Sequence, residues 1–221
     1  DRRDTQRAAE NTEGSARTLT VSLSTDETNA LLQHVPKVYH TRIDDVLLTA
    51  LARAFQRWTG EDALLVELEK HGREDLFEDV DLSRTVGWFT SAFPVLLKVE
   101  TPKEQLRRIP RGGIGYGLLR YLCSDEVVAR EMSELPHPEV SFNYLGQLDQ
   151  MFQASGMFRL ARESSGPTRD AHAQRGNLLE INASIIGGQL QAEWTYSAEI
   201  HDRATIEKLA HDFIEELQAL F

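Results

Sequence analysis

The clearest pattern along this chain is that of an amphipathic helix. Apolar residues recur at spacings of three and four between Leu47 and Trp58, and Gly60 stands where a helix commonly ends. A second such pattern follows Asp202, a candidate helix cap, and keeps its apolar residues on one face as far as Leu220. Both segments are expected to be helices that cover a hydrophobic core.

Alternating and continuous apolar runs predict strands between and around these helices. Pro94 lies in one of them and places its start at a sheet edge or a bulge, because proline lacks a backbone donor. Gly187 and Gly188 join two others in the clearest hairpin pattern of the chain. The segments expected to be strands are 18–23, 63–68, 92–99, 140–145, 178–186 and 189–196.

Smaller helices and loops occupy the remaining positions. Ser24 and Glu27 have the spacing of a capping box, and residues 124–126 cap a helix that reaches Met132. Residues 154–176 are polar and rich in turn formers, which is typical of a long loop. Strands and helices alternate and an antiparallel hairpin comes late, so the fold class is α/β, an α+β sandwich with a mixed sheet.

Composition narrows the functional classes. The 221 residues include 35 acidic and 24 basic ones, and a net charge of −11 disfavours nucleic acid, whose phosphates need a positive surface. No apolar run is long enough to span a membrane. Residues 1–17 are polar and are expected to be a linker or mobile arm rather than a signal peptide. Cys123, the one cysteine, is expected to be a buried small side chain in a protein of the reducing cytoplasm.

Two patterns resemble ligand sites but lack what those sites need. Residues 111–117 are glycine-rich, yet they follow Pro110 rather than a strand and lack the Lys-Ser/Thr ending of a phosphate loop, so we expect a turn. His40 and Asp44 mimic part of an acyltransferase motif, but Asp44 opens a helix and His40 is incidental. The histidines show no metal-ligand spacing, so no metal is expected.

An ionisable cluster follows the strand predicted at 63–68. It contains Glu69, His71, Arg73 and Glu74 within six residues. In one interpretation Arg73 bridges the carboxylates and the cluster is an ion-paired strand end. In the other, one carboxylate points into a cleft, where desolvation raises its pKa toward the range useful for proton transfer. The residue types alone leave both interpretations open.

Five motifs occur in a defined order along the chain. They are DVLLTAL at 45–51, EKHGRE at 69–74, RTVGWFT at 84–90 with Phe93 and Pro94 after it, PRGGIGYG at 110–117 and FNYLGQ at 142–147. Together they resemble the epimerization domains of nonribosomal peptide synthetases, members of the condensation-domain superfamily.

The resemblance implies a fold of two lobes, each similar to chloramphenicol acetyltransferase, with a mixed and mainly antiparallel sheet flanked by helices. Residues 18–221 resemble the C-terminal lobe. The N-terminal lobe and its His-His-x-x-x-Asp-Gly motif are missing, since no His-His pair occurs in this sequence. The chain is therefore expected to carry half an active site and to be inactive alone.

The resemblance also implies the reaction, the partners and the site residues. The family inverts the α-carbon of an aminoacyl or peptidyl thioester, which a carrier domain holds on its phosphopantetheine arm; this chain itself is expected to bind no cofactor. Glu69 matches the family's acid/base. Asn143, Tyr144 and Trp88 match substrate-tunnel residues that position the substrate or neighbour an oxyanion, unless Asn143 and Tyr144 are merely hydrogen-bonded strand residues. His71 and Arg73 support the turn.

Two departures from the family pattern bear on activity. Lys70 stands where the family usually has glycine, which is expected to alter the turn that aims Glu69, and the segment between Val99 and Gln105 is short. Whether the chain belongs to an active enzyme is therefore left open. The alternatives are a noncatalytic module that docks a carrier domain and a lobe of a condensation domain, which forms peptide bonds.

Overall fold

A single six-stranded sheet forms the centre of the protein, in the order β1-β6-β5-β4-β2-β3. The computed structural model describes residues 11–35, 42–74, 78–148, 163 and 166–220. The strands are β1 (Ala16–Ser22), β2 (Ala63–Lys70), β3 (Ser91–Lys98), β4 (Val140–Gln147), β5 (Leu179–Ile186) and β6 (Gln189–Ser197). Every predicted strand is therefore present.

The sheet is mixed, as predicted. β2, β4 and β5 run parallel to one another, whereas β1, β6 and β3 each pair antiparallel with their neighbours. Pro94 lies in β3, the last strand of the sheet, where a missing backbone donor is tolerated. The expected edge position is confirmed.

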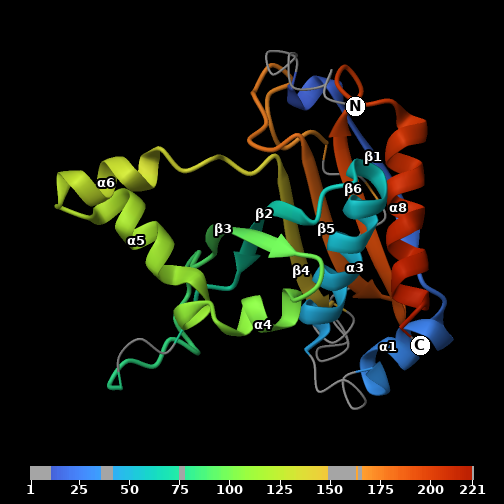
Figure 1. The fold of residues 1–221 in the computed structure, drawn as a ribbon, viewed down its shortest axis with the longest axis horizontal. Coiled ribbons are helices and arrows are strands. Elements are labelled where there is room, and N and C mark those ends of the chain that lie inside the picture. Colours follow the sequence, from blue (N-terminus) through green and yellow to red (C-terminus); the bar gives the residue numbers. More distant parts are fainter. Residues whose placement is uncertain (1–10, 36–41, 75–77, 149–162, 164–165, 221) are drawn as a thin grey trace.

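Two long helices, α3 (Ile43–Thr59) and α8 (Arg203–Gln218), cover one face of the sheet (Figure 1). Their apolar stripes pack on alternate residues of the strands, and Trp194 of β6 meets Phe213 of α8 edge to face, with ring centroids 5.8 Å apart. Gly60 ends α3 in the left-handed conformation, as predicted. Asp202 is the N-cap of α8, although its side chain makes no capping hydrogen bond.

The remaining helices within the described residues are short. They are α1 (Thr25–Gln33), α4 (Pro102–Arg107), α5 (Ile114–Leu122) and α6 (Glu126–Ser133), with 3-10 turns at Glu13–Ser15 and Pro110–Gly113. Ser24 and Glu27 form the predicted capping box of α1. Helices α5 and α6 form an arm that extends away from the sheet beyond β3 (Figure 1). Cys123, which follows α5, is half-buried rather than buried.

The glycine-rich segment divides into a turn and a helix, whereas the sequence predicted a turn throughout. Gly112 and Gly113 have φ values of 61° and 85° and make the turn. Gly115 and Gly117 lie inside α5, which starts at Ile114. The turn ends where positive φ ends, and residue type alone does not distinguish the two pairs of glycines.

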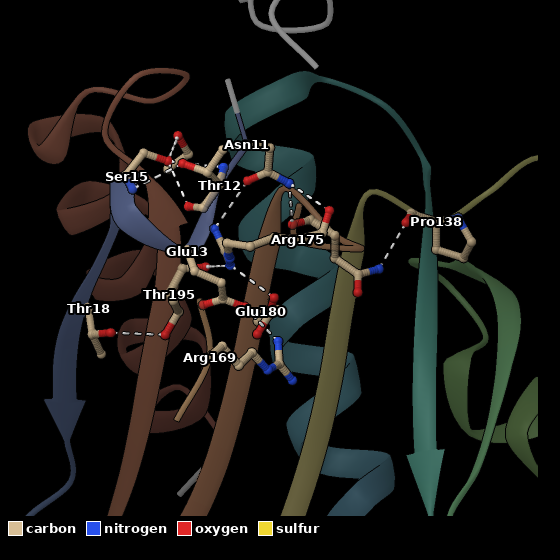
Figure 2. Close-up of polar contacts among 12 residues, drawn as sticks. Asn11, Thr12, Glu13, Ser15, Thr18, Pro138, Arg169, Arg175, Glu180 and Thr195 are labelled. Atoms are coloured by element: carbon tan, nitrogen blue, oxygen red, sulfur yellow. Dashed lines mark hydrogen bonds and ion pairs between the residues drawn. The ribbon is translucent and has the colours of Figure 1, made fainter. Parts of the chain in front are cut away.

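Residues 11–17 belong to the packed fold, although the sequence predicted a linker over residues 1–17. Asn11 is buried, and its amide donates to the backbone carbonyls of Arg175 and Asn177 (Figure 2). Arg175 in turn pairs with Glu180 at 3.1 Å. These polar contacts, rather than apolar burial, hold the segment, so its hydrophilic composition was misleading. Residues 1–10, and residues 154–162, 164 and 165 of the loop predicted at 154–176, lie outside the described residues.

The second face of the sheet is polar, and α3 and α8 do not cover it. Strand alternation directs every other side chain of β2 and its neighbours toward this face. Two rows cross the sheet in register. One contains Glu67, Ser141, Glu180, Thr195 and Thr18, and the next contains Glu69, Asn143, Asn182, Glu193 and Thr20. Glu69 therefore belongs to a polar surface that runs across all the strands from β2 to β1.

Candidate active site

Glu69 lies at the C-terminal end of β2, where the strand gives way to the turn of the EKHGRE motif. Leu64, Val66 and Leu68 alternate with it and are buried against the helices. Because side chains alternate along a strand, Glu69 points to the polar face and Lys70 points toward α3. The apolar pattern of β2 thus determines which charged residue of the motif points to the polar face of the sheet.

Asn143 of β4 holds the carboxylate of Glu69. Its Nδ2 donates to Oε2 of Glu69 at 3.1 Å. The two strands are parallel, and Leu68 pairs with Phe142, so the next residue of each strand lies side by side. An amide donor orients the carboxylate without supplying a charge that would hold it permanently ionised. Both side chains line a cavity of about 820 Å³ at the ends of β2 and β4.

The surroundings of Glu69 favour its protonated form. Desolvation in the half-buried site raises the pKa of Glu69 above its ordinary value, and the negative charges of Glu67 and Glu180 raise it further. A carboxyl with a raised pKa exchanges a proton more readily near neutral pH than an exposed one. Of the two interpretations of this cluster, the geometry favours a carboxylate that points into a cleft.

We expect Glu69 to make folding stability depend on pH. Its pKa is higher in the folded state, so its favourable contribution is complete below the unfolded pKa and is lost as pH rises through the folded pKa. Glu69→Gln should therefore stabilise the protein more, relative to wild type, at about pH 7.5 than at about pH 3.5. Urea unfolding at both pH values measures this. Glu61→Gln, at an exposed site after α3, is the control, and an equal effect of both variants would contradict the prediction.

Lys70 does not disturb the turn as the sequence predicted. It is a strand residue opposite Ser91, and the left-handed position of the motif is Gly72, with a φ of 65°. The Lys70 ammonium forms an ion pair with Asp44 in the first turn of α3. A lysine is therefore accommodated at this position, and its charge is neutralised on the opposite side of the strand from Glu69.

Tyr144 lines the same cavity but leaves β4 on the opposite face from Asn143. Burial, followed by the negative charge of Asp44, raises the pKa of Tyr144 to about 12, so its phenol stays protonated. The structure brings Asn143 into contact with Glu69 and gives Tyr144 a place on the cavity wall. The substrate-positioning roles of both residues remain predictions.

Arg73 braces the turn instead of bridging carboxylates. Its guanidinium donates to the carbonyl oxygen of Leu82 at 2.6 Å and lies 4.3 Å from the ring centroid of Phe89. Its backbone N–H donates to Nδ1 of His71 at 2.9 Å. Since these contacts link EKHGRE to RTVGWFT, they favour the predicted supporting roles of His71 and Arg73 over the ion-paired interpretation.

Trp88 stands apart from the other predicted site residues. Its side chain is 91% exposed and does not line the cavity around Glu69. Its neighbour Phe89 packs under Arg73 instead. The tunnel role of Trp88 stays a prediction, because none of the residues that the structure describes encloses its side chain.

Sequence reasoning missed three carboxylates that act on the site. Asp44 was assigned only to a helix start, and Glu67 and Glu180 were not considered, although alternation along β2 could have placed Glu67 beside Glu69. His40 lies outside the described residues. Within the described ranges, no cluster of His, Cys, Asp and Glu could hold a metal ion, and no helix is long and apolar enough to cross a membrane.

Comparison with known proteins identifies the class of protein. The condensation domain model matches residues 3–221, so the chain belongs to the condensation domain family. A linear gramicidin synthase of Brevibacillus parabrevis is 48% identical over 96% of this chain and 3% of its own length. Chondramide synthase cmdD of Chondromyces crocatus is 44% identical over 95% of this chain and 6% of its own length. The chain thus spans only a few per cent of these relatives.

The solved structures add a narrower likeness. The epimerization domain from the third module of tyrocidine synthetase B superposes with a TM-score of 0.87 at 36% identity, over 96% of this chain and 49% of that one. A four-domain nonribosomal peptide synthetase bound to AMP and glycine superposes with a TM-score of 0.64 at 14% identity, which shows the fold alone. The predicted fold is confirmed, and the chain corresponds to about half of the epimerization domain structure.

Proposed function

We propose that this chain is the C-terminal lobe of an epimerization domain. The domain inverts the α-carbon of an aminoacyl or peptidyl thioester that a carrier domain presents on its phosphopantetheine arm. Glu69 carries the proposal: it is a half-buried carboxyl with a raised pKa, oriented by Asn143 and open to a cavity. The likeness to an epimerization domain at 36% identity supports this assignment over condensation.

Inversion needs one proton removed and another returned to the opposite side of the α-carbon. The thioester acidifies the α-proton, and the Glu69 carboxylate takes it, so the C–H bond breaks and an O–H bond forms. The electron pair moves into the enolate, whose oxygen needs donors nearby. The raised pKa of Glu69 makes it a stronger base for this step than an exposed carboxylate. No electrons enter or leave the substrate overall.

We expect the second proton to come from a group outside this lobe. Glu69 lies on the polar face of the sheet, so the substrate occupies the space in front of that face. A group that reprotonates the opposite side of the α-carbon must approach from beyond the substrate, where a second lobe would face this one. The N-terminal lobe of the same domain is the expected source of this proton. The cytoplasm stays the expected location of the protein.

The experiment compares this chain with the two-lobe protein, in which the other half of the domain is present. An L-aminoacyl thioester on a holo carrier domain is incubated in deuterated water, and mass spectrometry follows deuterium at the α-carbon. We expect exchange and a mixture of L and D residues with the two-lobe protein only. Dipeptide formation from a donor and an acceptor carrier without α-proton exchange would indicate condensation instead, and rapid formation of the D residue by this chain alone would overturn the half-site.

A further inference from the structure

A second cavity, of about 470 Å³, lies beside Glu69 and takes no part in the chemistry described above. Glu67 and Ala92 line it, together with one side of α5. Ala92 pairs directly with Glu69 across β2 and β3, so their Cβ atoms are separated by about 5 Å. A substituent on a substrate carbon atom that is held beside Glu69 can therefore reach this cavity without passing another strand or helix.

The cavity is lined mainly by apolar and aromatic side chains. They are Phe89, Ile114, Tyr116, Leu118, Tyr121 and Leu122.

The basic groups at its rim are already engaged. Arg120 donates to the carbonyl oxygen of Met132 at 2.7 Å and to the Tyr116 hydroxyl at 3.1 Å, and Nδ1 of His137 lies 3.0 Å from the Pro138 carbonyl oxygen. Such a lining suits an apolar group.

The larger cavity around Glu69 has a different lining. Arg42, Arg107, His71 and Asn143 supply polar groups there, which suit the amides of a phosphopantetheine arm. The smaller cavity offers the carboxylate of Glu67 and the hydroxyl of Ser91, which has no hydrogen-bond partner among the described residues, but apolar and aromatic side chains make up most of its lining. The lining of the larger cavity therefore suits the polar phosphopantetheine arm, and the lining of the smaller cavity suits an apolar substituent at the α-carbon.

We propose that the cavity between β3 and α5 receives the side chain of the residue being inverted, and that it selects bulky apolar side chains. This inference rests on the proposed function and deepens it. Tyr116 and Gly117 of the PRGGIGYG motif acquire a role, because α5 forms the wall and both residues line the cavity.

Gly117 gives a direct way to fill the cavity. A Cβ at Gly117 would meet nothing within 4 Å, and the residue lies inside a helix without a positive φ, so a side chain there is accommodated. Gly115 is its matched control: it lies in the same helix, its Cβ would also meet nothing within 4 Å, and it does not line the cavity. Both replacements improve the helix propensity of α5.

The test measures kcat/KM for α-proton exchange by the two-lobe protein with phenylalanyl and alanyl thioesters on the carrier domain. Gly117→Phe should lower the value for the phenylalanyl thioester by about tenfold or more and change that for the alanyl thioester by less than about twofold. Gly115→Phe should leave both within about twofold. Gly117→Leu, whose side chain fills less of the cavity, should give an intermediate loss of kcat/KM for the phenylalanyl thioester. This second variant keeps the test valid if the Phe variant misfolds.

Three outcomes would overturn the inference. Equal losses for both thioesters would place the arm or the carrier domain in the cavity, and no loss for either would leave the substrate outside it. A loss confined to a lysyl thioester would show that Glu67 selects a basic side chain instead. In each case wild-type exchange persists and the proposed function stands, whereas absence of exchange in the wild type would refute the proposed function itself.

Discussion

Replacing Glu69 by Gln in the two-lobe protein is expected to reduce α-proton exchange by about 10²- to 10⁴-fold. Glutamine keeps the shape of the side chain, and its carbonyl oxygen can still accept the hydrogen bond from Asn143 Nδ2. It cannot take the α-proton, so only the proton transfer is removed. Mass-spectrometric deuterium exchange at saturating thioester isolates this step from substrate binding.

Glu67→Gln provides the comparison on the same face of the same strand. It removes one of the two negative charges that raise the pKa of Glu69, so that pKa should fall while exchange persists. The pH–rate profile of this variant should shift toward lower pH on its acidic side. If Glu69→Gln kept more than about a tenth of the wild-type rate, Glu69 would not be the group that moves the proton.

The second large effect is expected from Gly72→Ala, which should lower the free energy of unfolding by more than about 2 kcal/mol and remove most of the exchange activity. Gly72 has a φ of 65°, and a Cβ there would overlap the carbonyl oxygen of Phe89 and lie 2.7 Å from its carbonyl carbon. The contact is with backbone, so no rotamer relieves it. The RTVGWFT segment must move, and Arg73 then loses its place over Phe89.

Gly60→Ala separates this crowding from simple backbone strain. Gly60 has a φ of 77°, but a Cβ there would meet nothing within 4 Å. Its replacement should cost about 1–2 kcal/mol and leave the exchange rate unchanged, because it ends α3 away from the site. Urea unfolding of both variants measures the difference. Equal destabilisation by Gly72→Ala and Gly60→Ala would mean that glycine is needed at position 72 only because φ is positive there, and that crowding against Phe89 is unimportant.

Several site features depend on pairings between distant parts of the chain. Asn143 meets Glu69 across 74 residues because β2 and β4 are parallel neighbours, and the alternation of each strand is compatible with other neighbours. Lys70 meets Asp44 across 26 residues because α3 covers the face opposite Glu69. From its type alone, Arg73 could bridge carboxylates or stack on an aromatic ring. It stacks on Phe89 because the fold brings the RTVGWFT segment next to it.

Local patterns were sufficient for the strands, the principal helices and the order of the motifs. Apolar periodicity reports which face of an element is buried, and the capping box and the Gly60 end of α3 are interactions between residues close in sequence. Alternation also determines that Glu69 and Lys70 leave β2 on opposite faces. These features need no knowledge of the neighbouring elements.

Tertiary structure alone decided the order of the strands, the partner of each charged group and the environment that raises the pKa of Glu69. It also placed Asn11 in the packed fold. The reason is the same in each case. Hydrogen bonds, desolvation and charge interactions act through distance in space, and a residue's type and local spacing do not specify which distant groups the fold brings within that distance.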